Sequence, residues 1–555
     1  MPAEANLFTN GKIFLSGVRP GTNAGLNRQP TFAESMVIWG DKIELIGSDS
    51  DVAAAAAKHD IVHLRNLDGK TVLPGFVDAH MHLMLLGQSL NKLDIGKCKT
   101  LADIQNRIRT YAAAHPDVPR ILCRGYMHSM TAPAHVTAVD LDGLDDGREK
   151  SRPILIDSKD LHSSWCNTAA IEELGAANWV DVPGGVIERD DEGKPTGVFT
   201  EAANITYVWP FLSSVASMDQ RTAAIQAAVS AYHRAGYTGL IDMAMDEESW
   251  AALQALRADG SIPIRIAAYW LIRPLHSDAD NVAQVNRAIE LAGQYNAMTT
   301  PDCRVVGIKV ICDGIIDACT AGLSEPYAHN DHVEVPLWTF EQLEPVVRRA
   351  NEAGLQVALH AIGDATIKMV VDVLTAHASP DRRPRVEHLE LASEADAARL
   401  GQAGITASIN PVHADPAILR AWPKLLGEQR CGRAFAYREF ADGGAPLALG
   451  SDAPTAPHTP LGNVYVATTR KSYREPEMQT AVNPRFALGL CEAIAAGTQG
   501  AAYSCFDDHR IGALENGHKA DFVVVEMEWD QEKLMEARVA ETWYDGAKVW
   551  SAPEK

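Results

Sequence analysis

The sequence has no Cys-x-x-Cys pair, no excess of basic residues and no long apolar run, and each absence excludes a class of protein. The nine scattered cysteines indicate reduced thiols in a cytoplasm rather than a disulfide framework. With 72 acidic against 50 basic residues, the net charge of -22 would repel nucleic acids and anionic membrane surfaces. No run approaches a membrane span, and the first residues lack the basic and apolar segments of a leader. We therefore expect a cytoplasmic protein without nucleic-acid or membrane partners.

The length of 555 residues favours one large domain with a smaller one attached, and 46% apolar residues can fill both cores. Residues 1–75 consist of short strand-like runs, with Asn10-Gly11, Gly40-Asp41 and Asp68-Gly69 as expected hairpin turns. Residues 506–555 resume this style. The two ends are therefore predicted to pair into one small, discontinuous β-sandwich domain.

Between these ends, residues 76–505 alternate strand-like runs with helical segments, which is typical of parallel strands. A capping box of Ser217 and Gln220 begins one helix, which is expected to stop at Gly236. Eight strand-like runs suggest a closed α/β barrel of the (β/α)8 TIM type. They are LPGFVDAH, GYTGLIDMA, IPIRIAAYWLI, RVVGIKVICDG, GLQVALHAIGD, RPRVEHLE, GITASINPV and APLALGSDA.

One connection in this barrel is much longer than the others. About 150 residues separate the first strand from the second, so an insertion subdomain is expected at about residues 83–230. Because it leaves from the end of the first strand, the insertion begins at the face where barrel enzymes hold their catalytic residues. It is expected to shape the pocket.

Six chemically active residues stand at the ends of strand-like runs. His80 and His82 close the first run, and alternation along a strand points both imidazoles to one face, where they can hold a cation. A single buried histidine is more often an ordinary core residue than a ligand, but six coincidences in order predict a two-metal hydrolase site. The six residues are His80, His82, Lys309, His360, His388 and Asp452.

Nearly the whole chain resembles the amidohydrolase superfamily, and in particular its family 3 branch of N-substituted formamide deformylases and YtcJ-like enzymes. PGFVDAHMH, the lysine of GIKVICDG, LHAIGD, VEHLE and GSDAP are similar to the successive strand motifs of that branch. DLHSSWCNTAAI and GVFTEAA resemble its insertion. The segment IIDACTAGLSEPY after Asp313-Gly314 departs from the pattern, so the substrate of a deformylase does not simply carry over.

The resemblance implies that His80, His82 and Asp452 hold one metal and that His360 and His388 hold a second. Lys309 would bridge both as a carbamate, because a desolvated lysine can lose its proton and react with carbon dioxide. A pair of Zn²⁺ ions is expected, with Mn²⁺ or Fe²⁺ as alternatives.

The bound metals would turn a bridging water into hydroxide. Asp452 would take its proton and pass it to the leaving nitrogen. The structural alternatives are a cap of the next helix at the Pro454 turn for Asp452 and, for a half-buried Lys309, a pair with Asp313 or another carboxylate.

Residues of the insertion and of one barrel strand are candidates for substrate contact. His162 is expected to hydrogen-bond a substrate carbonyl, as a third catalytic residue, unless it only fixes the insertion. Tyr126, Trp165 and Trp270 are expected to wall an apolar pocket, with ordinary core packing as the alternative. Cysteine replaces the bridging lysine in some relatives, but packing is the expected role of Cys98, Cys123 and Cys312.

Together these features predict a metal-dependent amidohydrolase that cleaves a carbon-nitrogen bond in an N-substituted amide, formamide or carbamate-like small molecule by attack of a metal-activated hydroxide. The alternative keeps the binuclear site for a cyclic amide or lactam, a deamination or an ester. A non-catalytic relative would have lost ligands, and no phosphate loop or second pair of strand-end acids supports a phosphate- or sugar-active barrel. By analogy with barrels of this size, a homodimer is expected.

Overall fold

The computed structural model describes residues 5–15, 18–22, 25, 28–59, 62–131, 134–145, 151–159, 163–182, 185–201, 203–260, 262–275, 277–328 and 333–553. The chain forms two compact units. The first consists of Met1–Leu83, Val229–Trp250 and Arg257–Lys555, and the second of Met84–Ala228 with Ala251–Leu256. No helix in the described ranges is long and apolar enough to cross a membrane.

The first unit contains an eight-stranded sheet in which each strand runs parallel to its neighbours. A parallel bridge between Met81 and Ala453 joins its two edges, so the sheet curls into a nearly closed barrel. The strands, in spatial order, are β8 (Phe76–Met81), β15 (Tyr237–Met245), β16 (Arg265–Ile272), β17 (Cys303–Ile311), β18 (Gln356–Ala361), β19 (Arg385–His388), β20 (Thr406–Ile409) and β21 (Leu447–Leu449). The (β/α)8 fold and its eight strands are confirmed.

Helices connect successive barrel strands, as parallel pairing requires. Ser217 and Gln220 form the expected capping box, and the helix that follows ends before Gly236, whose φ of 97° suits only glycine. The main helices are α6 (Met218–Ala235), α7 (Glu247–Ala258), α8 (Asp278–Gln294), α9 (Phe340–Glu352), α10 (Asp364–His377), α11 (Glu394–Gln402), α14 (Tyr437–Asp442), α15 (Pro460–Thr469), α16 (Leu490–Ala495) and α17 (Ala501–Tyr503).

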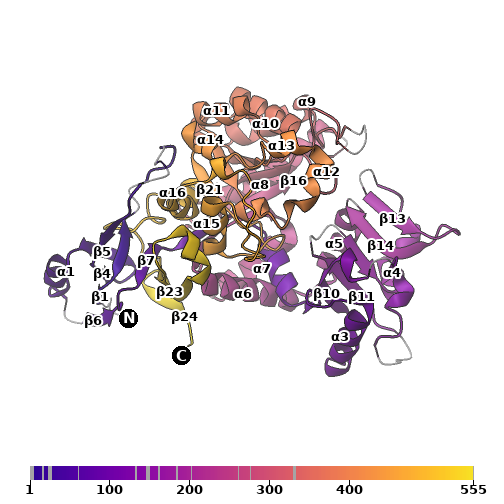
Figure 1. Cartoon of the computed structure of the whole chain (residues 1–555), viewed down its shortest axis with the longest axis horizontal. Coiled ribbons are helices and arrows are strands. Elements are labelled where there is room, and N and C mark those ends of the chain that lie inside the picture. The colour runs from indigo at the N-terminus through magenta and orange to yellow at the C-terminus, as the bar shows by residue number, and fades with distance from the viewer. Residues whose placement is uncertain are drawn as a thin grey trace. The chain divides into compact units, whose positions relative to one another are not determined.

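Strands from the two ends of the chain pair with each other, as predicted. β22 (Phe522–Glu526) runs antiparallel to β7 (Thr71–Pro74), and Figure 1 shows the yellow C-terminal strands beside the indigo N-terminal ones. Two sheets, ordered β5-β4-β1-β6 and β24-β23-β22-β7-β2-β3, share one apolar core that includes Phe8, Phe522 and Trp543. Their other strands are β1 (Ala5–Thr9), β2 (Lys12–Leu15), β3 (Thr31–Ala33), β4 (Ser35–Trp39), β5 (Lys42–Gly47), β6 (Val62–Asn66), β23 (Arg538–Tyr544) and β24 (Ala547–Ser551).

The prediction of a hairpin is wrong at two of the three N-terminal turns. Gly40-Asp41 does join the antiparallel strands β4 and β5. At Asn10-Gly11 and at Asp68-Gly69, however, the chain crosses from one sheet into the other. The two crossings lie side by side, because the Gly69 N–H donates to the Asn10 carbonyl and β1 runs parallel to β6. Each of these two dipeptides therefore predicts the bend correctly, but the strands before and after the bend do not pair with each other.

The second unit has its own sheet, ordered β13-β14-β12-β11-β10-β9. It consists of β9 (Leu93–Asp94), β10 (Ile121–Tyr126), β11 (Ile154–Ser158), β12 (Ser163–Cys166), β13 (Gly185–Arg189) and β14 (Pro195–Glu201), accompanied by α3 (Leu101–Ala114) and α4 (Thr168–Leu174). Almost all of it lies between the first and second barrel strands, so the long insertion after strand β8 is confirmed.

Candidate metal centre

The end of strand β8 carries a bulge just where its two histidines stand. Opposite β15, the register jumps from Asp78 to Met81 while β15 advances only from Leu240 to Asp242, so β8 contains one extra residue. Val77, before the jump, and Ala79, within it, belong to an apolar cluster drawn from five barrel strands. An extra residue of this kind changes the direction of the side chains that follow it. His80, directly after Ala79, contacts Glu387 on β19.

Asp452 lies where the last barrel strand meets the first. Its backbone N–H donates to the His80 carbonyl at 2.7 Å, and the His82 N–H donates to the Ala453 carbonyl at 3.0 Å. Its carboxylate Oδ1 lies 3.1 Å from His82 Nε2 and 3.6 Å from His80 Nε2. Asp452 has a φ of 54°, in the left-handed region that non-glycine residues rarely adopt. The backbone that closes the barrel thus holds this carboxylate against both imidazoles.

The register of β17, β18 and β19 places two more candidate ligands close together. Lys309 pairs with Ala358, two residues before His360, and His360 pairs with Glu387. Neighbours in register share a face of a parallel sheet, so Lys309, His360 and Glu387 lie on one face.

By the same rule His388, which pairs with Ala361, would face away from the others. A tight turn changes this, because its φ is 76° and the Leu389 N–H bonds the Glu387 carbonyl at 3.1 Å across it. The His388 ring centroid consequently lies 4.4 Å from that of His360 and 4.8 Å from that of His80. Strained backbone of this kind is often found at functional sites.

The donor atoms that converge here suit a divalent cation. Ligand atoms of His80, His388 and Asp452 lie within 4.8 Å of one another. Three buried nitrogens, His82 Nδ1, His388 Nδ1 and Lys309 Nζ, have no hydrogen-bond partner among the described residues. Buried polar groups are normally satisfied, so imidazoles beside a carboxylate and an unsatisfied amine fit a metal centre.

Burial sets the charge state of these groups. It lowers the pKa of His80 to about 4 and that of His360 to about 3, with the Lys309 charge adding to both effects. It also lowers the pKa of Lys309 to about 8. For Asp452, burial alone would raise the pKa, but the surrounding imidazoles hold it well below its usual value. His80 and His360 are therefore neutral and Asp452 is ionised, which is the form in which these groups bind metal.

A second layer of polar residues surrounds these groups, and the sequence reasoning missed most of it. Glu387 accepts a hydrogen bond from His80, and His413, just after β20, lies 3.5 Å from Asp452 Oδ2 and 3.3 Å from Glu390 Oε1. The His413 ring stacks parallel to that of His388, with centroids 5.8 Å apart. Glu387 and Glu390 flank His388 in the motif VEHLE, and that motif was the available signal.

Asp313 bonds backbone N–H groups and does not pair with Lys309. Its fully buried carboxylate accepts backbone N–H groups of Gly322, Ile362 and Gly363 at 2.9–3.4 Å. It joins the loop after β17 to the end of β18 and lies 3.4 Å from His360 Nε2. Burial raises its pKa to about 7. No hydrogen bond links it to Lys309 Nζ, so the structure gives no support to that alternative.

The candidate substrate contacts lie in packed environments. Tyr126 and Trp165 belong to the core of the second unit, with ring centroids 5.2 Å apart, and Trp165 is only 1% exposed. Trp270 is in register with Ile308 and therefore lies on the strand face opposite Lys309. These positions agree with the ordinary core packing that was the alternative for all three rings, and the expected pocket wall stays a prediction. His162 lies outside the described residues.

We predict that Trp165→Ala lowers the free energy of unfolding by about 3–5 kcal/mol, because a buried indole and its hydrogen bond to the Thr137 carbonyl are lost. Metal content should not change. Denaturant unfolding and elemental analysis test this, with Trp179→Ala, a half-buried ring stacked on Tyr207, as the milder control. Unchanged stability together with altered kcat/KM would instead support Trp165 as a substrate contact.

The cysteines do not join the candidate centre. None of the nine, all of which are described, forms a disulfide. Cys123 and Cys312 are buried, which raises the pKa of each thiol and makes a thiolate costly. Cys98 is partly buried and packs against the core of the second unit. Packing therefore accounts for all three.

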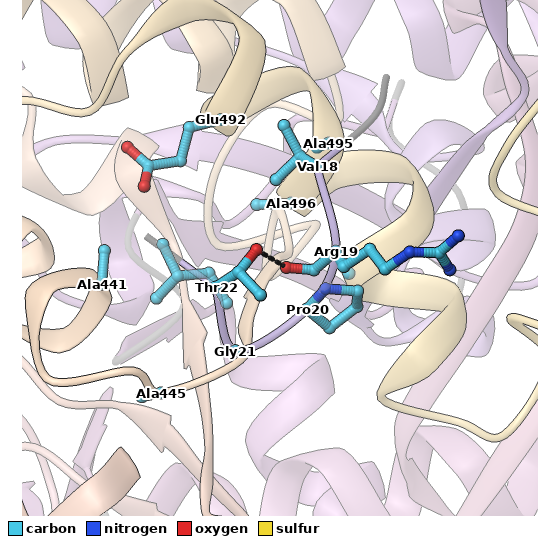
Figure 2. Close-up of a pocket in the computed structure, with 12 residues that line it drawn as sticks. Val18, Arg19, Pro20, Gly21, Thr22, Ala441, Ala445, Glu492, Ala495 and Ala496 are labelled. Carbon is cyan, nitrogen blue, oxygen red and sulfur yellow. Dashed lines mark hydrogen bonds between the residues drawn. The ribbon is translucent and has the colours of Figure 1, made fainter. Parts of the chain in front are cut away.

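A pocket lies elsewhere in the first unit. It is lined by the segment Val18–Thr22, by Leu447 at the start of β21 and by residues of helix α16. Figure 2 shows Glu492 and several alanines in its wall. It lies at the N-terminal end of the strand, whereas Asp452 follows the C-terminal end. None of the six candidate ligands lines it.

Known proteins resemble this chain along nearly its full length. A model of the third amidohydrolase group, described as "Amidohydrolase family", matches residues 63–550. Protein LONG AFTER FAR-RED 3 of Arabidopsis thaliana is 28% identical over 98% of this chain and 91% of its own. The putative amidohydrolase YtcJ of Bacillus subtilis is 27% identical, covering 89% and 93%, and the N-substituted formamide deformylase of Arthrobacter pascens is 24% identical, covering 93% and 94%.

Among solved structures, an uncharacterized metal-dependent hydrolase from Pyrococcus horikoshii matches with a TM-score of 0.77 at 22% identity, covering 95% of this chain and 98% of its own. That likeness supports the fold. The family model covers most of the sequence, and the family 3 resemblance seen in the motifs is confirmed by the YtcJ and deformylase relatives. The chain therefore belongs to the amidohydrolase family.

Proposed function

We propose that the protein hydrolyses a carbon-nitrogen bond in an N-substituted amide, formamide or carbamate-like small molecule, at a centre of two divalent cations. The observation that carries the proposal is the convergence of His80, His388 and Asp452 beside a fully buried Lys309 whose Nζ has no hydrogen-bond partner among the described residues. Similarity to a formamide deformylase supports the amide class of substrate. Burying a carboxylate, imidazoles and an amine in a protein core is costly unless they are paired, and bound cations would provide the missing partners.

The chain's own residues would divide between the two cations. His80, His82 and Asp452 would hold one, His360 and His388 the other, and Lys309, as a carbamate, would supply an oxygen to each. Zn²⁺ suits imidazole and oxygen donors best, and Mn²⁺ or Fe²⁺ suits the same set. Such cations, when bound, polarise a carbonyl and lower the pKa of water.

Asp452 is the proposed proton carrier. One carboxylate oxygen faces the imidazoles of His80 and His82, while the other lies 3.5 Å from His413 Nε2. A carboxylate held in this way can accept a proton from the attacking water and deliver it to the departing nitrogen. Glu390 holds the far side of the His413 ring and thereby fixes the direction of Nε2.

We expect His413→Ala to lower kcat by about tenfold, because Asp452 loses the partner that holds its second oxygen, while two ions per chain remain bound. Steady-state kinetics and elemental analysis on the same sample test this. His377→Ala is the matched control, since that histidine lies at the end of α10, outside the site. Unchanged kcat would show that His413 does not support Asp452 in catalysis.

Substrate class is tested with a panel of N-formyl, N-acyl and carbamate-like amines, with release of the free amine as the readout. Turnover of open-chain amides that fails after metal removal and returns with Zn²⁺ supports the proposal. Preference for a lactam, an ester or an amino-substituted ring would assign the same centre to the alternative reactions instead.

We also propose a cytoplasmic setting and a homodimer. Nine cysteines without a disulfide suit a reducing compartment, and a net charge of -22 disfavours nucleic-acid partners. Sedimentation equilibrium tests the dimer.

A further inference from the structure

A buried ion pair lies directly behind one of the candidate ligands. Arg385 and Glu387, two residues apart on β19, are both 0% exposed. Arg385 Nε donates to Glu387 Oε1 at 2.8 Å, and an Nη2 proton donates to Oε2 at 3.1 Å. Glu387 Oε2 also lies 2.8 Å from His80 Nδ1. The three residues form one continuous chain of contacts inside the barrel.

The guanidinium is fixed on its other sides as well. It donates to the Ala79 carbonyl at 2.7 Å and to the hydroxyls of Ser408 and Ser504 at 2.9 Å each. Buried ion pairs contribute little net stability compared with apolar residues of similar size, because desolvating both charges is costly. Stability alone therefore does not account for a fully buried pair next to His80.

The contacts decide which nitrogen of His80 carries the proton. Both oxygens of Glu387 accept from Arg385, so the carboxylate is ionised and can only accept. His80 Nδ1 must then be the N–H donor, which leaves the lone pair on Nε2, the nitrogen that faces Asp452 Oδ1 at 3.6 Å. By contrast, His82 Nδ1 and His388 Nδ1 have no hydrogen-bond partner among the described residues.

We propose that Glu387, anchored by Arg385, is a positioning residue that fixes His80 in the tautomer whose Nε2 binds a cation. The inference rests on the proposed metal centre, and it concerns binding rather than turnover. A carboxylate behind a metal-bound histidine fixes ring orientation and tautomer, and losing such a partner typically weakens metal affinity about 10–100-fold.

Glu387→Gln gives a sharp test, because Arg385 offers only donors. Because Arg385 donates to both carboxylate positions, the new amide sets its NH₂ against a guanidinium N–H in either orientation. The amide is therefore displaced and no longer holds the proton on His80 Nδ1. We expect one of the two ions to bind at least about tenfold more weakly. Zn²⁺ titration of the metal-free protein against a chromophoric chelator measures the affinity, and the visible spectrum of the Co²⁺ form reports the changed ligand.

Glu492→Gln is the matched control. Glu492 is also buried and is held by Arg438 at 2.6 and 3.0 Å, but it lies on α16, outside the site. Its variant should bind both ions with unchanged affinity. A loss of affinity equal to that of Glu387→Gln would attribute the effect to weakened folding in general and overturn the proposal.

A second variant separates tautomer control from packing. In Arg385→Met/Glu387→Gln the amide is free to turn its oxygen toward His80, so affinity should recover to within about threefold of the native protein. If Glu387→Gln does not fold, this double variant alone decides, and weak binding by it would contradict the proposal. Native protein that binds no metal would instead refute the proposed function, while equal affinities in native and Glu387→Gln protein would refute only this inference.

Discussion

Asp452→Asn should lower kcat by at least about 10³-fold, which is within the range for loss of a general base that also ligates metal. The carboxylate lies 3.1 Å from His82 Nε2, and neighbouring imidazoles keep its pKa well below the ordinary value, so it is ionised at neutral pH. Asparagine keeps the shape but loses the charge and one acceptor. Steady-state kinetics with elemental analysis measures the effect, and we expect the metal content to fall to at most one ion.

Asp521→Asn is the control for this change. Asp521 is equally buried and pairs with Arg265 at 3.0 Å beside the C-terminal sheet, outside the site. Its variant should be less stable but should retain both ions and its kcat. If Asp452→Asn kept more than a tenth of native activity, Asp452 would be no more than a structural cap at the closure of the barrel.

Lys309→Ala should lose at least one ion and lower activity by at least about 10³-fold, because no other described side chain can bridge two cations from that position. Lys309 is 2% exposed and its Nζ has no hydrogen-bond partner in the described part of the chain, so an ordinary ammonium would be buried unsatisfied. Acetate or propionate should partly restore both metal and activity by occupying the vacated space.

Lys309→Met tests the rescue itself. Methionine fills the same space without a charge, so small carboxylates should find no room and should not restore activity. Rescue of both variants alike would mean that the carboxylate acts elsewhere. Native activity in Lys309→Ala would show that the lysine bridges nothing.

The fold could be predicted from the sequence because its signals are local. Each barrel strand is an apolar run that ends in a turn or a helix cap, and the candidate ligands at these ends are recognisable from their residue types. His80, Lys309 and His360 were found in this way, and strand alternation places Lys309 and His360 on one face. Pairing partners are not local, which is why Asn10-Gly11 was assigned to a hairpin although the chain crosses there between two sheets.

The details of the site depend on backbone geometry that residue type does not encode. The motif PGFVDAHMH does not predict the extra residue in β8. The motif VEHLE does not predict the left-handed backbone of His388, which places its ring beside those of His80 and His360. Strict alternation would have turned His388 away from His360. Glu387 and His413 acquire their roles only from contacts across the barrel, and the burial of Trp165 follows from the packing of the insertion.

The central claim, a pair of cations held by these side chains, is tested most directly by anomalous diffraction from crystals of metal-replete protein, with data collected on both sides of the zinc edge. We predict two anomalous peaks, one beside His80, His82 and Asp452 and one beside His360 and His388, with density extending past Lys309 Nζ toward both. Peaks elsewhere, or replete protein in which these side chains contact no ion, would contradict it.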